Sequence, residues 1–272
     1  MTGRGTRRIG VLLGKEIDDL LGSPGLFVPA AITGLIAVML PFVVAIAIPA
    51  LTGESLADSS DFRVALEMYR DQPATRGLDP EGAIQAYLFQ RFLILLVLAP
   101  VASAMAVAAH AVVGEKQART LEPLLATPLT TFELLAAKVL GAMLPGLALV
   151  AIFFSLYLGG VVATAAPGVY WTLLAPRALL TVFLFSPLAS LAALQLTVCV
   201  SARVNDVRSA QQIGALIIMP ISALMVAEFA GLVDLSAGAV VALSGGLALL
   251  NVVLMGVAIR LFDRESILTR WK

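Results

Sequence analysis

Six long runs without a charged residue or a histidine dominate this chain of 272 residues. They span residues 26–53, 92–109, 139–176, 178–202, 209–227 and 235–259. A helix needs about 20 mostly apolar residues to cross the hydrocarbon layer of a membrane, and all runs but the third fit one crossing each. Because 60% of the residues are apolar and only 13% are charged, most of the surface must face lipid. The pattern predicts an all-α integral membrane protein.

The third run is too long for one helix and contains a break. Ala165-Ala166-Pro167-Gly168 is a typical turn sequence, and Tyr170 and Trp171 follow it, where aromatic rings favour the membrane interface. We therefore predict six transmembrane helices, at 26–51, 88–111, 139–163, 171–200, 211–232 and 237–261. They form a single transmembrane domain over residues 1–272.

The basic residues are divided unevenly between the two sides that these crossings define. Thirteen of the 18 lie on the side of both termini: Arg4, Arg7, Arg8, Lys15, Lys116, Arg119, Lys138, Arg203, Arg208, Arg260, Arg264, Arg270 and Lys272. The other five are Arg63, Arg70, Arg76, Arg91 and Arg177. Since Lys and Arg accumulate in cytoplasmic loops, both termini are predicted to be cytoplasmic. The longest loop, 52–87, is then external, and the sequence leaves its role open.

An amphipathic segment precedes the first crossing. Its apolar residues recur at helical spacing: Ile9, Leu12, Leu13, Ile17, Leu20 and Leu21. This spacing predicts a helix over 6–22 that lies in the cytoplasmic interface of the membrane. An ordinary cytoplasmic helix packed against the bundle has the same pattern, so that alternative stays open.

The segment between the second and third crossings, 113–138, is the most informative part of the sequence. Leu121, Leu124 and Leu125 are spaced to share one face of a short helix, and Pro128 ends it. Charged residues flank these leucines, among them Glu115, Arg119 and Glu122. A short cytoplasmic helix with exposed leucines suits docking into a groove on another protein.

The same segment resembles the signature of ABC-2 type transporter permeases. The matching residues are Glu115, Arg119-Thr120-Leu121-Glu122, Leu124-Leu125, Thr127-Pro128 and Lys138. In that family an acidic-basic stretch, a T-L-E-x-L-L-x-T-P-like core and a following lysine occupy the cytoplasmic loop between these crossings. The number of crossings, the cytoplasmic termini and the chain length are also similar to the family.

The resemblance implies a permease subunit of an ABC transporter, and an exporter rather than an importer, in the cell membrane of a prokaryote. It would form the translocation path as a homodimer or with a homologous permease, driven by a separate ATPase subunit in two copies. ATP and Mg would bind to that partner. The loop would couple the two proteins, with polar contacts from Glu115, Arg119 and Glu122, packing from the three leucines, and Thr120 and Pro128 in the motif. The alternative is an ATP-independent channel or secondary transporter.

Two further groups of polar residues are candidate sites. Arg203, Asp206 and Arg208 lie in the second cytoplasmic loop, where they either touch the ATPase or simply satisfy the positive-inside rule. Arg91, Arg177 and Glu228 lie near the external ends of their helices. Charge near lipid is costly, so we expect Glu228 to pair with Arg177 or Arg91 or to line an external cavity. Arginine side chains that extend to the nearby surface are the alternative.

Several function classes do not fit the sequence. The net charge of zero gives no indication of a nucleic-acid partner, and the single cysteine, Cys199, leaves no cysteine-based metal cluster. An intramembrane enzyme would need a Ser–His pair, paired aspartates or an H-E-x-x-H motif at depth, and the crossings contain none of these. Gly10–Glu16 lacks the spacing of a phosphate-binding loop, so we expect no catalytic, cofactor or metal site in this chain.

Overall fold

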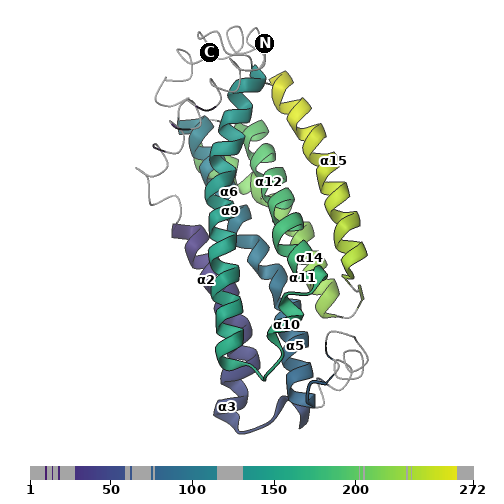
Figure 1. The fold of residues 1–272 in the computed structure, drawn as a ribbon. Helices are drawn as coiled ribbons and strands as arrows, with labels where there is room; N and C mark the ends of the chain where they lie inside the picture. Colours follow the sequence, from purple (N-terminus) through teal and green to yellow (C-terminus); the bar gives the residue numbers. More distant parts are fainter. Residues whose placement is uncertain are drawn as a thin grey trace.

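The long helices of this protein run side by side along one axis (Figure 1). The computed structural model describes residues 28–58, 77–114, 131–201, 203–204, 206–230, 232–233 and 235–261, and the single residues 10, 14, 18, 62 and 75. All regular structure in these residues is helical. Within these described residues, six helices are long and apolar enough to cross a membrane: Val28–Thr52, Pro80–Val113, Leu135–Thr164, Pro176–Ser201, Val207–Glu228 and Ala237–Leu261. This confirms the predicted all-α architecture and agrees in number with the six predicted crossings.

Most of these spans are composite, because short turns of different geometry interrupt them. The first contains α2 (Val28–Phe42), η2 (Val43–Ala47) and α3 (Ile48–Thr52), and η3 (Leu56–Asp58) follows it. The second contains α5 (Pro80–Phe92), η5 (Leu93–Val97), α6 (Leu98–Ala109) and η6 (His110–Gly114). The third is α9 (Thr131–Thr164), and α10 (Tyr170–Leu173) follows it. The fourth span contains α11 (Pro176–Leu180), η7 (Thr181–Phe185) and α12 (Ser186–Ser201). The fifth contains α13 (Val207–Gly214), η8 (Ala215–Ile217) and α14 (Ile218–Phe229). The sixth is α15 (Ala237–Leu261).

Prolines account for four of the interruptions. The π turns η2 and η7 end two residues before Pro49 and Pro187, and the 3-10 turns η5 and η8 end three residues before Pro100 and Pro220. A proline has no N–H for the preceding turn, and its ring clashes with the carbonyl four residues earlier. The backbone therefore changes its hydrogen-bond spacing: Ile48 N donates to Val43 O, and Ser186 N donates to Thr181 O, both over five residues.

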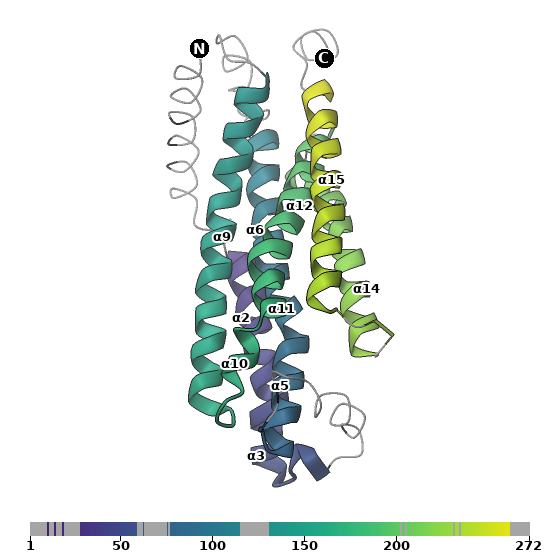
Figure 2. The same ribbon diagram turned by 45° about the vertical axis from the view of Figure 1, so that its right-hand side comes forward.

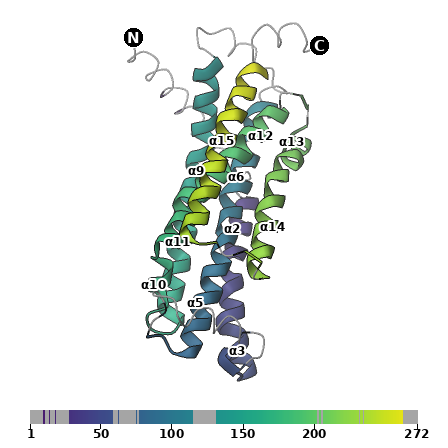
Figure 3. The same ribbon diagram turned by 90° about the vertical axis from the view of Figure 1, so that its right-hand side faces the viewer.

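The second and fourth spans form the centre of the bundle. In the most apolar part of Pro80–Val113, 83% of the residues are buried, against 17% in Val207–Glu228 and in Ala237–Leu261. Figure 2 shows α6 and α12 between α9 and α15, and Figure 3 shows α13 and α14 along one edge of the bundle. The outer helices expose large apolar side chains, such as Leu249 and Val252 of α15, which suits contact with lipid.

Glycines allow α2 and α9 to approach each other closely. A methyl group at Gly34 would overlap the Phe153 ring, and one at Gly160 would lie 2.6 Å from Phe42 Cζ. Phe42 also packs against the rings of Phe89 and Tyr157, with centroids 5.1 and 5.7 Å away. Small residues at such positions are typical of membrane helix interfaces, because they let neighbouring backbones pack tightly.

Several predicted helix starts differ from the observed ones, among them those at 139 and 211, where the helices begin at Thr131 and Val207. The second helix begins at Pro80, eight residues before the predicted crossing, since Asp79 caps it by accepting a hydrogen bond from Gly82 N at 3.0 Å. Instead of one helix from residue 171, α10 and α11 are separate, and Pro176 starts the latter. The break predicted at 165–168 is present: α9 ends at Thr164, and Gly168 has a φ of 92°. The predicted interfacial helix 6–22 lies almost entirely outside the described residues.

Candidate functional site

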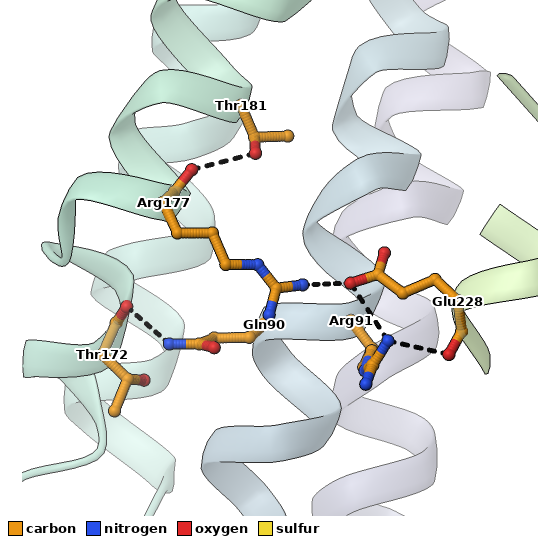
Figure 4. Close-up of polar contacts among 6 residues, drawn as sticks. All are labelled: Gln90, Arg91, Thr172, Arg177, Thr181 and Glu228. Atoms are coloured by element: carbon orange, nitrogen blue, oxygen red, sulfur yellow. Dashed lines mark hydrogen bonds and ion pairs between the residues drawn. The ribbon is translucent and has the colours of Figure 1, made fainter. Parts of the chain in front are cut away.

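Three charged residues from three different spans meet inside the bundle. Arg91 comes from α5, Arg177 from the first turn of α11, and Glu228 from the last turn of α14 (Figure 4). Arg91 and Glu228 are each only 1% exposed, and 16% of the Arg177 side chain is exposed. The structure thus brings together the polar residues that the sequence singles out near the external ends of these helices. The arginine side chains turn inward toward the carboxylate.

One carboxylate oxygen of Glu228 forms ion pairs with the guanidinium groups of both arginines. Glu228 Oε1 lies 3.1 Å from Arg91 Nη1 and also forms an ion pair with Arg177 Nη2. The same Arg91 Nη1 donates to the main-chain oxygen of Glu228 at 2.7 Å. Carbonyls in the last turn of a helix need partners from outside it, and a cation is favoured there. Arg91 therefore binds both the end of α14 and the side chain that this end carries.

The rest of the Arg91 side chain is held by its own helix. Its Cζ lies 5.0 Å from the centre of the Tyr87 ring, one turn earlier in α5, which is within the range of a cation–π contact. Its Nε is buried and has no hydrogen-bond partner among the described residues. Burying a charge is costly unless it is paired, so the cluster makes the relative positions of α5, α11 and α14 strongly interdependent.

Polar side chains around this charged cluster connect α5 to α10 and to the turn between α9 and α10. Gln90 Nε2 donates to Thr172 O at 3.0 Å, and Ala166 N donates to Gln85 Oε1 at 2.8 Å. Thr181 Oγ1 donates to Arg177 O at 2.9 Å, which satisfies a carbonyl at the start of α11. Figure 4 shows Gln90 and Thr172 beside the ion pairs. These hydrogen bonds join helices to one another. No group of residues suited to hold a metal ion occurs in the described ranges.

A 3-10 turn next to the cluster creates a further polar contact. Leu93 N donates to Gln90 O, three residues back, instead of to Phe89 O. The hydroxyl of Tyr157, which is fully buried in α9, donates to Phe89 O at 2.8 Å. The sequence shows Tyr157 only as one aromatic residue in an apolar run, so this role depends on the geometry of a neighbouring helix.

The opposite end of the bundle carries the second candidate region. The coupling residues named from the sequence, Glu115, Arg119, Thr120, Leu121, Glu122, Leu124, Leu125 and Pro128, all lie outside the described residues. On either side of them, α6 ends in the π turn η6, and α9 begins at Thr131. Lys138, the lysine that closes the motif, is 4% exposed and donates from Nζ to Ala111 O at 3.1 Å.

The loop before α13, which the sequence predicts to be cytoplasmic, leads directly into that helix. Asp206 caps this helix: Oδ2 accepts from Ser209 N at 2.8 Å and from Ser209 Oγ at 2.9 Å. These hydrogen bonds, the backbone one first, lower the pKa of the Asp206 carboxyl. Arg203 and Arg208 are exposed, while Val204 and Val207 pack against Ala109, Val113 and Ala210. Asp206 therefore has a local structural role, and the two arginines are accessible.

Comparison with known proteins found one family. The model of the ABC-2 family transporter proteins matches residues 68–245, which run from the segment before α5 into α15 and include 115–130. No curated protein and no solved structure matches the chain.

Proposed function

The chain belongs to the ABC-2 family of transporter proteins, and from that premise we propose that it is the permease subunit of an ABC exporter. Permeases of this family are membrane subunits that work with an ABC ATPase subunit. In this proposal two copies of the chain, or one copy and a homologous permease, form the translocation path. Two ATPase subunits bind ATP and Mg, and their movements drive the cycle.

The family match is the observation that carries the proposal, since it covers the second to fifth apolar spans and reaches the sixth. The six spans support it independently. An even number of crossings puts both termini on one side, and the excess of Lys and Arg favours the cytoplasm of a prokaryotic cell for that side. The apolar faces of α14 and α15 are mostly exposed, and they fit lipid or a second copy.

We further propose that residues 115–130 are the coupling element. Leu121, Leu124 and Leu125 would fill an apolar groove on the ATPase, and Glu115, Arg119 and Glu122 would make polar contacts at its rim. Arg203, in the loop before α13, and Arg208, in the first turn of α13, are exposed, so they are available for a second contact with the same partner. Both contacts lie at the end of the bundle from which α6, α9 and α13 extend into the membrane.

The charged cluster belongs to the other end of the bundle in this proposal. It would hold α5, α11 and α14 together while the cytoplasmic ends of α6 and α9 move. A buried ion pair is either closed or broken. In this proposal the helices around the external half of the path, α5, α11 and α14, therefore stay together or separate as a unit.

The test is co-expression of the tagged chain with an ABC ATPase encoded beside it, followed by purification and reconstitution in vesicles. We expect the ATPase to co-purify and its rate of ATP hydrolysis to depend on the permease. A channel or secondary transporter, the alternative, would move its substrate without ATP and would bind no ATPase. Failure of any such ATPase to bind the intact chain would contradict the proposal.

A further inference from the structure

Lys138 is a buried lysine inside the apolar span that begins at Leu135. It lies about 10 Å along α9 from the first residue of that helix, Thr131. A buried ammonium group is costly unless acceptors surround it. Its Nζ donates to the main-chain oxygen of Ala111, which is 27 positions earlier in the chain. Lys138 thus joins the start of α9 to the end of α6.

The acceptor, Ala111 O, belongs to the π turn η6. The prolines that explain the other interruptions do not explain this one. The turns η2, η5, η7 and η8 each end two or three residues before a proline, whereas η6 is followed by Glu115, Lys116 and Gln117. No missing N–H therefore forces this turn out of α geometry. A π turn changes the spacing of backbone hydrogen bonds, which allows an outside donor to reach one of its carbonyls, and such turns are frequent at functional sites.

Tightly packed side chains surround this contact. Val112 of the π turn is fully buried and belongs to one cluster with Leu135 and Val139 of α9. The next residue, Val113, is also fully buried and packs with Ala210 of α13. Packed interiors transmit a displacement because their side chains have little room to adjust. The end of α6 and the starts of α9 and α13 therefore form one unit at the base of residues 115–130.

We propose that Lys138 is a positioning residue that ties together the two ends of the coupling element. A force applied to 115–130 then moves α6 and α9 together instead of spreading their ends apart. This inference rests on the proposed function, in which an ATPase binds 115–130. Without the Lys138 contact, the ATPase still binds, but less of its movement reaches the membrane helices.

The test compares Lys138→Met with the wild-type chain, both co-purified with the ATPase. Met keeps most of the length and apolar surface of lysine but cannot donate a hydrogen bond. We expect unchanged ATPase binding. We also expect a roughly 2- to 30-fold smaller change in amide hydrogen exchange of α6 and α9 when a non-hydrolysable ATP analogue binds. Lys138→Arg, which keeps a donor, should recover at least half of that change.

Asn251→Leu is the matched control. It also removes a buried side-chain donor to a main-chain oxygen, because Asn251 Nδ2 donates to Leu188 O at 3.0 Å, away from the base of 115–130. This variant should keep the full response. If Lys138→Met does not insert, Lys138→Gln, whose amide is too short to reach Ala111, replaces it.

The outcomes separate the two proposals. A wild-type response in Lys138→Met, or an equal loss in Asn251→Leu, would overturn the role of Lys138 and leave the proposed function intact. Loss of ATPase binding in the Lys138 variants would also overturn it, since the residue would then serve binding and not transmission. If no ATPase binds the wild-type chain, both proposals fail.

Discussion

Arg91 binds Glu228 twice with one nitrogen: Nη1 lies 2.7 Å from the main-chain oxygen of Glu228 and 3.1 Å from its Oε1. The contact ties α5, which belongs to the most buried of the six spans, to the end of α14, which belongs to one of the two most exposed spans. Arg177 approaches the same carboxylate from α11. The position of the fifth span thus depends on charges as much as on apolar packing.

Removal of one member of this cluster should destabilise the protein strongly. We expect Arg91→Met or Glu228→Gln to cost about 3–5 kcal/mol in free energy of unfolding in detergent, because the remaining charge stays buried without its partner. Glu54→Gln, at an exposed carboxylate, should cost nothing measurable. The variant that carries both Arg91→Met and Glu228→Gln should lose less free energy of unfolding than the two single variants lose in sum. Equal melting temperatures for Glu228→Gln and Glu54→Gln would show that the ion pairs contribute little.

Two adjacent glycines in α9 provide a matched pair for the packing of α2 on α9. A Cβ at Gly160 would lie 2.6 Å from Phe42 Cζ, whereas one at Gly159 meets nothing within 4 Å. Phe42 cannot move away easily, since it packs against Phe89 and Tyr157. We expect Gly160→Ala to cost about 1–3 kcal/mol in detergent unfolding and Gly159→Ala to cost nothing. Similar effects from the two substitutions would contradict the close approach of these helices.

The cap at the start of α13 should be independent of pH across the physiological range. Hydrogen bonds from Ser209 lower the pKa of the Asp206 carboxyl, so the charged form stabilises the folded helix end. The stability that the charged carboxylate contributes is fully present above the usual carboxyl pKa of about 3.9. It is lost as the pH falls through the lowered pKa of Asp206. Protection of the Ser209 amide against hydrogen exchange should therefore stay constant from about pH 8 to pH 5. It should fall in Asp206→Ala and persist in Asp206→Ser; a midpoint above pH 5 would contradict this role.

Much of the fold follows from the apolar runs, and the exceptions have local causes. The residues 80–91 of α5 are too polar for a hydropathy pattern, yet Asp79 and Pro80 are a typical N-cap and first helical residue. The separation of α10 from α11 follows from Pro176, whose preceding residue is disfavoured in a helix.

The charged cluster could be predicted only in part. Arg91, Arg177 and Glu228 are conspicuous because each borders an apolar run, but the sequence does not tell which helices are neighbours. Lys138 and Tyr157 donate to main-chain oxygens that lie in or beside η6 and η5, the turns that depart from α geometry. No sequence pattern indicates such acceptors. The role of 115–130 remains a prediction from the sequence and the family.

The orientation in the membrane can be tested with two exposed positions at opposite ends of the bundle. In a Cys199→Ala background, Glu54→Cys should react with an impermeant thiol reagent added to intact cells. Arg208→Cys should react only after the cells are permeabilised. The reverse pattern would place both termini outside and would contradict a cytoplasmic coupling element.

The central claim is that a separate ATPase binds the leucines between the second and third spans, and co-purification of Leu124→Asp with that ATPase tests it most directly. The control is Leu51→Asp, the same change at a leucine that is 86% exposed at the other end of the bundle. We predict that Leu124→Asp inserts normally but retains less than about a tenth of the ATPase, since a charge in an apolar interface costs well over 1.4 kcal/mol. Leu51→Asp should retain all of it. Equal amounts of ATPase with both variants would contradict the account.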